Sequence, residues 1–373
     1  MSNLKHHTRA TILRPHPHAG FTLLEILVVI GLLSILALGM ATMLEDDGNW
    51  QRAQETPRRW DAIRKAILGQ GGLDATGNPI LSGFVADMGR LPLNIKELMV
   101  EDVDPTSVIA CPTPKPNPQP AWADFVIYQK TAATNCTVAP ENCYWLGGGW
   151  RGPYLYTGGS ADFRDGWENV DGDANADEVN FGWQLTPTVI SGFTPNITDI
   201  FVQSFGYGNE VGLGASTNDT NRADYPADSN LAMVNENEWL NTNPILQFNL
   251  QLNKPVTANI SGLYLGLYYF QDDANSCTAA GLTDDLISTE FTIPNGNRTA
   301  TVSISLPSDR GLPAGRYAAV IFCSDPNLAA STSALQVFDD ESGACIDFNN
   351  NSFPFYFDLR PSTNMINVQW NLP

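Results

Sequence analysis

The sequence predicts an α+β fold, in which a long N-terminal helix packs on a small antiparallel sheet and is followed by a C-terminal all-β sandwich. Three observations lead to this prediction. Residues 26–44 form an uncharged apolar run, and "RRWDAIRKAIL" resumes apolar positions at helical spacing. After Asn243 the chain breaks into short alternating segments separated by Asn, Gly, Asp and Pro. The total length of 373 residues allows about two domains beyond the helix.

The first element is a candidate membrane helix over residues 26–44. At about 1.5 Å rise per residue, this uncharged run spans nearly all of a hydrocarbon core of about 30 Å. Lys5, Arg9 and Arg14 precede it and should stay on the cytoplasmic side by the positive-inside rule. The sequence therefore predicts a single-pass protein whose N-terminus lies inside and whose C-terminus lies outside. We expect Pro57 to end the helix or to kink it.

A short motif lies directly ahead of the apolar run. A secretory signal peptide would be cleaved after its apolar region, whereas the Gly20-Phe21 junction precedes it. The run from Gly20 to Glu25, "GFTLLE", resembles the type IV prepilin motif. The resemblance implies that a prepilin peptidase cleaves between Gly20 and Phe21, removes the leader of residues 1–20 and leads to N-methylation of Phe21. A bitopic membrane protein whose acid is paired inside another complex is the alternative that stays open.

Glu25 is an acid inside an apolar segment. An ionised carboxylate at the centre of a bilayer costs about 2.5–3.5 kcal/mol on insertion scales, so it requires a partner. The resemblance implies that Glu25 pairs with the N-terminal amine of a neighbouring subunit and acts in assembly. The partners it implies are other pilin or pseudopilin subunits, the prepilin peptidase, the inner-membrane assembly platform and the membrane.

Composition indicates an exported acidic protein. The chain has 20 basic and 40 acidic residues, and removal of the leader leaves 17 basic residues and a net charge of −23. Nucleic-acid binding is not expected, because it depends on a basic face. The mature chain would contain no histidine, which excludes Ser-His-Asp catalysis and histidine-bound zinc. The four histidines of the leader are His6, His7, His16 and His18.

The cysteines form an even set, which favours disulfides in a compartment outside the cytoplasm. Spacing alone does not fix their pairing, and free buried thiols remain an alternative. The six residues are Cys111, Cys136, Cys143, Cys277, Cys323 and Cys345.

Several segments of the middle region resemble the major pseudopilin of type II secretion. "DMGRLP" at 87–92 is similar to a turn that follows the long helix in that family. The same holds for "GGWRGPYL" at 148–155, "RDGW" at 164–167 and "SFGYGNEVG" at 204–212. Two features depart from the family: Glu168 replaces an expected glycine, and the insert from Cys111 to Cys143 is long. The alternative is that these residues are ordinary turn and core positions.

An acidic loop is the candidate calcium site. Oxygen-bearing side chains alternate in "NVDGDANADEVNFG" at 169–182, and calcium takes about six to eight oxygen ligands in such loops. The pattern of an EF-hand is incomplete, because Ala176 replaces its glycine and Trp183 cannot ligate. A solvated acidic turn is the alternative. The candidate ligands are Asp171, Asp173, Asn175, Asp177 and Glu178. The pseudopilin resemblance adds Asp219 and Asp224 as secondary candidates.

The sequence divides into four parts. We assign residues 1–20 to the leader and 21–68 to the N-terminal helix, with 21–44 as its transmembrane and filament core. Residues 69–240 form a pseudopilin-like globular domain, and 244–373 form a β-sandwich. In this last part "LPAGRYAAVIFC" resembles the strand start of immunoglobulin-like modules. We expect its aromatic residues to lie in the sandwich core; they are Tyr264, Tyr268, Tyr269 and Phe270.

The resemblance implies a structural subunit, not an enzyme. We expect a minor or tip subunit of a type IV pilus or a type II secretion pseudopilus, because the part outside the membrane is large. The precursor would lie in the bacterial inner membrane, and the assembled filament in the periplasm or outside the cell. The alternative function is a surface adhesin or binding module that uses the pilin stem as its anchor.

Overall fold

The structure is a computed structural model, and two units are described separately: residues 1–52 and residues 53–373. The described residues are 22–71, 81–100, 122–129, 143–158, 163–168, 179–191, 195–204, 225–226, 231–242, 245–252, 255–271, 281–323, 336–339, 344–347, 354–361 and 366–371.

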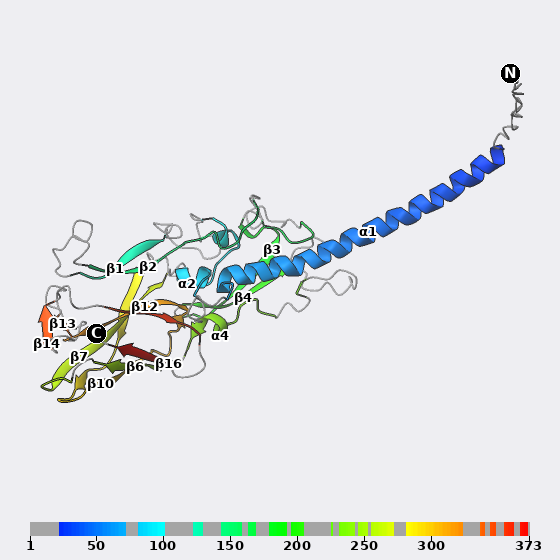
Figure 1. The fold of residues 1–373 in the computed structure, drawn as a ribbon. Helices are drawn as coiled ribbons and strands as arrows, with labels where there is room; N and C mark the ends of the chain where they lie inside the picture. The colour runs from blue at the N-terminus through cyan, green and yellow to red at the C-terminus, as the bar shows by residue number, and fades with distance from the viewer. Residues whose placement is uncertain are drawn as a thin grey trace, which may run out of the picture. The chain divides into compact units, whose positions relative to one another are not determined.

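The first element is a single long helix, α1 (Leu23–Leu68) (Figure 1). Its segment Leu23–Met40 has a mean hydropathy of 2.6 and is long and apolar enough to cross a membrane. Apolar side chains in this segment are exposed, for example Leu23 at 79% and Ile35 at 71%. Such a surface is stable in contact with lipid or with other helices, but not in water. The predicted apolar helix is thus confirmed.

The C-terminal part of α1 belongs to the second unit and is amphipathic. Ile63 and Ile67 are completely buried in a core that includes Ile200 of the strand β4 (Ile197–Ser204). The indole N–H of Trp60 donates a hydrogen bond of 2.8 Å to the carbonyl of Val202. The expectation that a helix packs on a small sheet is therefore confirmed in this part of the chain.

The helix does not end at Pro57, which lies inside α1. A proline lacks the N–H that would bond to the carbonyl four residues earlier, so the helix loses one hydrogen bond here. Contacts on both sides of the position offset this loss. Glu55 pairs with Arg58 and Arg59 across it, and the next two turns are anchored in the core.

The first core collects residues from most of the short elements that follow α1, whereas the first strand pair contacts the C-terminal strands. The sequence predicted one small antiparallel sheet here. The structure has two separate antiparallel pairs instead, β1 with β2 and β3 with β4. The elements are α2 (Phe84–Met88), η1 (Lys96–Leu98), β1 (Ala123–Gln129), β2 (Cys143–Gly148), β3 (Trp183–Val189), α4 (Glu236–Trp239) and β5 (Leu240–Asn241).

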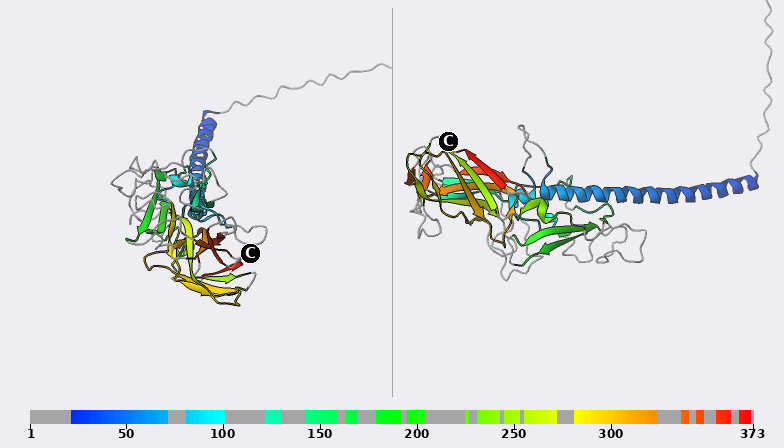
Figure 2. Two further views of the ribbon diagram at one scale, coloured as in Figure 1. Left: turned by 90° about the vertical axis from the view of Figure 1, so that its left-hand side faces the viewer. Right: turned by 90° about the horizontal axis from the view of Figure 1, so that it is seen from below.

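The C-terminal strands form two sheets around a second core. One sheet has the order β14-β13-β12-β7-β8, with β15 on β12 and β9 on β7; the other has the order β10-β6-β16 (Figures 1 and 2). The strands are β6 (Ile245–Gln251), β7 (Ile260–Gln271), β8 (Gly281–Ile287), β9 (Phe291–Ile293), β10 (Thr299–Ser305), β12 (Gly315–Phe322), β13 (Gln336–Asp339), β14 (Ala344–Asp347), β15 (Phe355–Leu359) and β16 (Ile366–Asn371). The short strand β11 (Leu312–Pro313) lies outside these two sheets and pairs with β5.

This arrangement differs from a purely antiparallel sandwich in one strand. β16 runs parallel to β6, whereas every other pairing among the described strands is antiparallel. The chain reaches β16 from β15, which belongs to the other sheet, so the connection crosses between the layers and is not a hairpin. Parallel neighbours require such crossing connections, because a tight turn reverses the chain.

The second core is built from the inner positions of both sheets. Phe248 of β6 and Tyr269 of β7 are buried in it, and the Tyr317 hydroxyl donates a hydrogen bond of 2.6 Å to the carbonyl of Pro313. Phe270 is buried against Gly148 outside this core, and Tyr264 and Tyr268 are half-buried. The expected core position is therefore confirmed for Tyr269 and was wrong for the other three aromatic residues. Cys323, which packs against this core, is disulfide-bonded.

Candidate functional site

The predicted assembly residue Glu25 lies in the first turn of α1. Its Oε2 atom accepts a hydrogen bond of 2.9 Å from the Thr22 backbone N–H, and one of 3.1 Å from the Thr22 hydroxyl. The Glu25 N–H in turn donates to the Thr22 hydroxyl oxygen at 3.3 Å. This reciprocal pattern is a capping box, which satisfies N–H groups that the helix leaves without partners. Gly20 and Phe21 lie outside the described residues.

Thr22 is a functional residue that the sequence analysis missed. The signal was present, because a Ser or Thr followed three residues later by Glu marks a helix start. The cap places the carboxylate at the N-terminal end of α1, next to the position where cleavage would create a free amine. Glu25 caps its own helix start through Oε2, and the same carboxylate group is the one that could bind an amine.

A second cluster joins two motifs of the middle region to the C-terminal strands. Asp87 of α2, whose side chain is 1% exposed, lies 3.2 Å from a guanidinium nitrogen of Arg151 and 3.2 Å from one of Arg316 in β12. The Tyr154 hydroxyl donates to Asp87 at 3.1 Å. Burial raises the pKa of Asp87, against the opposite effect of the two guanidinium groups. Burial and the neighbouring carboxylate also raise the pKa of Tyr154.

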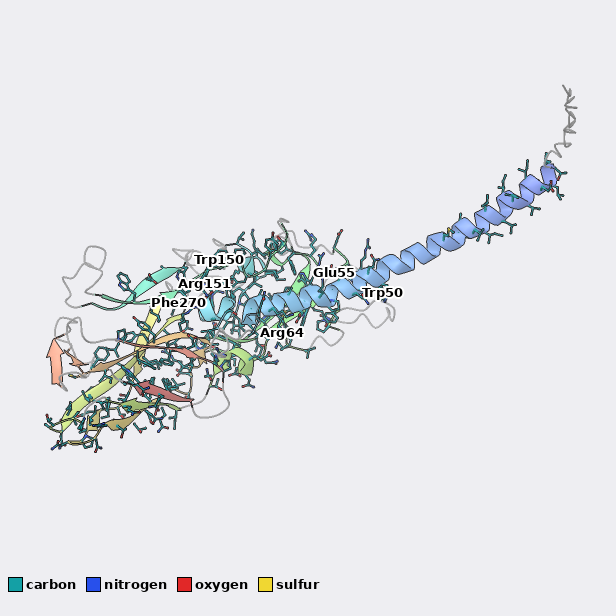
Figure 3. The ribbon with its side chains drawn as sticks, viewed as in Figure 1. Trp50, Glu55, Arg64, Trp150, Arg151 and Phe270 are labelled. Atoms are coloured by element: carbon teal, nitrogen blue, oxygen red, sulfur yellow. The ribbon has the colours of Figure 1, made fainter. Side chains whose placement is uncertain are left out.

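Aromatic rings pack closely against this cluster and against the neighbouring backbone. The Trp122 ring lies 4.7 Å from the guanidinium carbon of Arg151 and 5.0 Å from that of Arg316. A Cβ atom at Gly148 would collide with the Phe270 ring of β7, so only glycine fits there. Figure 3 marks Arg151 and Phe270 in this region. The cluster therefore holds the C-terminal strands directly against α2 and β2.

The "GRLP" turn contains a buried ion pair. Arg90 Nη1 lies 2.7 Å from Glu97 Oε2, and the two side chains are 3% and 0% exposed. The same carboxylate accepts a hydrogen bond of 3.2 Å from the Leu93 N–H, and the Trp150 indole donates 2.8 Å to the Glu97 carbonyl. The ion pair therefore fixes the turn and links it to the "GGWRGPYL" segment.

A third polar contact joins the two remaining motifs. The Ser204 hydroxyl donates a hydrogen bond to Oδ2 of Asp165, and both residues are completely buried. The Gly166 N–H donates to the Thr56 hydroxyl of α1 at 3.0 Å. The structure thus brings together "RDGW" and the start of "SFGYGNEVG" as folding contacts. These contacts agree with the alternative interpretation of these motifs, in which their residues are turn and core positions.

The predicted calcium ligands cannot be placed. Asp171, Asp173, Asn175, Asp177 and Glu178 lie outside the described residues, and so do the secondary candidates Asp219 and Asp224. Among the residues that the structure describes, no group of three His, Cys, Asp or Glu side chains is arranged to hold a metal ion. The calcium site therefore stays a prediction.

Comparison with known proteins identifies the N-terminal segment. Residues 16–41 match the family model described as the prokaryotic N-terminal methylation motif. These residues include the Gly20-Phe21 junction, the Thr22–Glu25 capping box and most of the apolar half of α1. No curated protein and no solved structure matches the chain.

Proposed function

We propose that the chain is a structural filament subunit of the type IV pilin and pseudopilin class, because residues 16–41 carry this methylation motif at the start of an exposed apolar helix. The observation that carries the proposal is the order of the parts: the motif, then an apolar helix, then a folded unit. A prepilin peptidase would remove residues 1–20, and α1 would pack with the same helix of neighbouring subunits.

We propose that the subunit is a minor or tip component and not the bulk repeating unit. The folded unit of residues 53–373 carries a complete β-sandwich in addition to the elements that pack on α1. A tip subunit occurs once per filament, so the β-sandwich would have to be accommodated only once and not at every repeat along the filament. The precursor would lie in the inner membrane with its N-terminus in the cytoplasm, as the basic leader suggests.

The position of the mature N-terminus tests the proposed function. We expect the mature protein to begin at Phe21 and to carry a methyl group on its α-amine. Intact-mass measurement of protein purified from membranes or filaments detects both changes. A mature chain that retains residues 1–20, or one that is cleaved beyond Leu44, would contradict the assignment.

We further propose that calcium binds the acidic loop that includes Asp171 and Asp173. An ion that binds only the folded state stabilises it by about 2.7 kcal/mol at a hundredfold excess over its dissociation constant. The purified protein should therefore melt several degrees higher in calcium than in chelator, and magnesium should substitute poorly. Asp173→Ala should abolish the difference without a change of melting temperature in chelator.

Asp309→Ala is the matched control, because Asp309 is an exposed acid of the sandwich. This variant should keep the full calcium response. If calcium leaves the melting temperature of the unmutated protein unchanged, the loop is a solvated acidic turn. A response that survives Asp173→Ala would place the ion elsewhere, most simply near Asp219 and Asp224.

A further inference from the structure

The outer face of the three-stranded sheet β10-β6-β16 has an unusual composition. Its inner positions are apolar: Leu246, Phe248 and Leu250 of β6 are buried in the second core, with Val302, Ile304 and Trp370 beside them. The positions between them point to the opposite face, because successive residues of a strand alternate. Ile245 at the start of β6 is the apolar member of this outward set. We call the polar outward side chains the amide-hydroxyl face; they are Gln247, Asn249, Gln251, Thr299, Thr301, Ser303, Ser305, Gln369 and Asn371.

Apart from Ile245 at one end of β6, every described outward side chain of this sheet carries a hydrogen-bonding group and no charge. Seven of the nine are exposed, and Gln247 and Asn249 in the central strand are half-buried. The whole chain has a net charge of −20, and edge strands of natural sheets commonly carry charged residues that prevent association. Both outer strands of this sheet, β10 and β16, lack such charges at these positions. The face therefore differs from an ordinary solvated acidic surface.

The register aligns the polar groups in rows. Thr301 lies directly opposite Asn249, which lies directly opposite Gln369 on the other side. The Thr301 hydroxyl donates to Oδ1 of Asn249 at 3.2 Å. Gln369 Nε2 donates to Oδ1 of Asn371 at 3.5 Å in the same strand. These contacts orient the amides before any ligand arrives, which reduces the entropy lost on binding.

We propose that the amide-hydroxyl face binds a neutral polysaccharide. Amides and hydroxyls both donate and accept hydrogen bonds, which matches the alternating donors and acceptors of sugar hydroxyls. Six of the nine side chains are Ser, Thr or Asn, which have fewer rotamers to lose than long side chains such as glutamine.

The net negative charge of the chain argues against charged ligands for this face. An anionic glycan would be repelled by the acidic chain, and a cationic ligand would favour the acids elsewhere on it. A protein partner would more commonly use aromatic or arginine anchors, which the face lacks. The proposal goes beyond the proposed filament function and does not depend on it, because the face lies in the sandwich and not in the processed segment.

Cosedimentation tests the proposal with the full mature protein, kept in a detergent that has no sugar headgroup. The probes are the insoluble neutral polysaccharides cellulose, chitin and β-1,3-glucan, with insoluble anionic polygalacturonate as the contrast. We expect binding to at least one neutral probe, little change with salt, and no binding to the anionic one. Thr301→Glu should weaken binding about tenfold or more, because it removes a donor and adds an unpaired charge next to Asn249 of the central strand.

Thr292→Glu is the matched control. Thr292 is an exposed strand threonine of the same sandwich, but it lies in β9 outside this face. It should bind as the unmutated protein does. Asn249→Ala, which adds no charge, should also weaken binding, and unchanged melting temperatures would show that both face variants are folded.

Three outcomes would overturn the proposal. They are absence of binding to all neutral probes, equal loss in Thr292→Glu and Thr301→Glu, and preferred binding to the anionic probe. Sedimentation velocity tests whether a second copy of this chain binds the face instead. Self-association that disappears in Thr301→Glu, without polysaccharide binding, would show that a second copy of this chain covers the face.

Discussion

Glu25→Ala leaves membrane insertion intact, or improves it, and strongly reduces incorporation into filaments. Removal of a carboxylate from an apolar segment can only lower the cost of insertion, so the variant should reach the membrane at least as well as the unmutated protein. A charge-assisted hydrogen bond contributes about 1.5–3 kcal/mol. Loss of such a bond to the neighbour's amine should lower incorporation roughly tenfold to a hundredfold.

The capping box makes Glu25→Gln the more informative variant. Glutamine at this position can still cap the Thr22 end of the helix, because the capping box accepts Glu or Gln. It cannot form an ion pair. If the charge pairs with an amine, Glu25→Gln should be nearly as defective as Glu25→Ala. Full incorporation of Glu25→Gln would instead assign the role of Glu25 to the helix cap.

Membrane fractionation and recovery of sheared filaments measure the two steps separately. Equal amounts of each variant in the membrane fraction are the control for expression and stability. A Glu25→Ala protein that is inserted, stable and incorporated at the level of the unmutated protein would show that neither the pairing nor the cap is needed for assembly.

The local features of the fold could be predicted from sequence. The uncharged run of residues 26–44 required a helix in an apolar environment, and the alternating segments after Asn243 required a sheet with one buried face. Both signals depend on residues close together in the chain. The Thr22–Glu25 cap has the same local character and could have been predicted in the same way.

The contacts that join the two cores are of a different kind. Arg316 and Asp87 are 229 residues apart in sequence, and no pattern near either residue indicates the other. The close fit between Gly148 and Phe270 depends likewise on the final packing of β2 against β7. The parallel pairing of β16 depends on the connection from β15, which alternation alone cannot predict.

Among single substitutions in the "GRLP" turn, we expect replacement of Arg90 to lower the free energy of unfolding most, because Arg90 forms a buried ion pair with Glu97. Arg90→Met leaves the Glu97 carboxylate buried without its cation, and breaking a buried pair in this way costs about 3–5 kcal/mol. Simultaneous replacement of both residues, Arg90→Met with Glu97→Met, should recover part of this loss, because it removes the uncompensated charge. The recovery should be incomplete, since Glu97 also accepts the Leu93 N–H.

Lys65→Met is the matched control for Arg90→Met, because Lys65 forms an exposed pair with Asp61 in α1. Exposed pairs contribute about 0–1 kcal/mol, so this variant should unfold at nearly the urea concentration of the unmutated protein. Urea unfolding followed by tryptophan fluorescence measures all three variants, and Trp150 reports locally because its indole donates to the Glu97 carbonyl. If Arg90→Met loses no more stability than Lys65→Met, the ion pair does not hold the turn. An equal loss in the single and double variants would mean that packing of the arginine stem, and not its charge, stabilises this region.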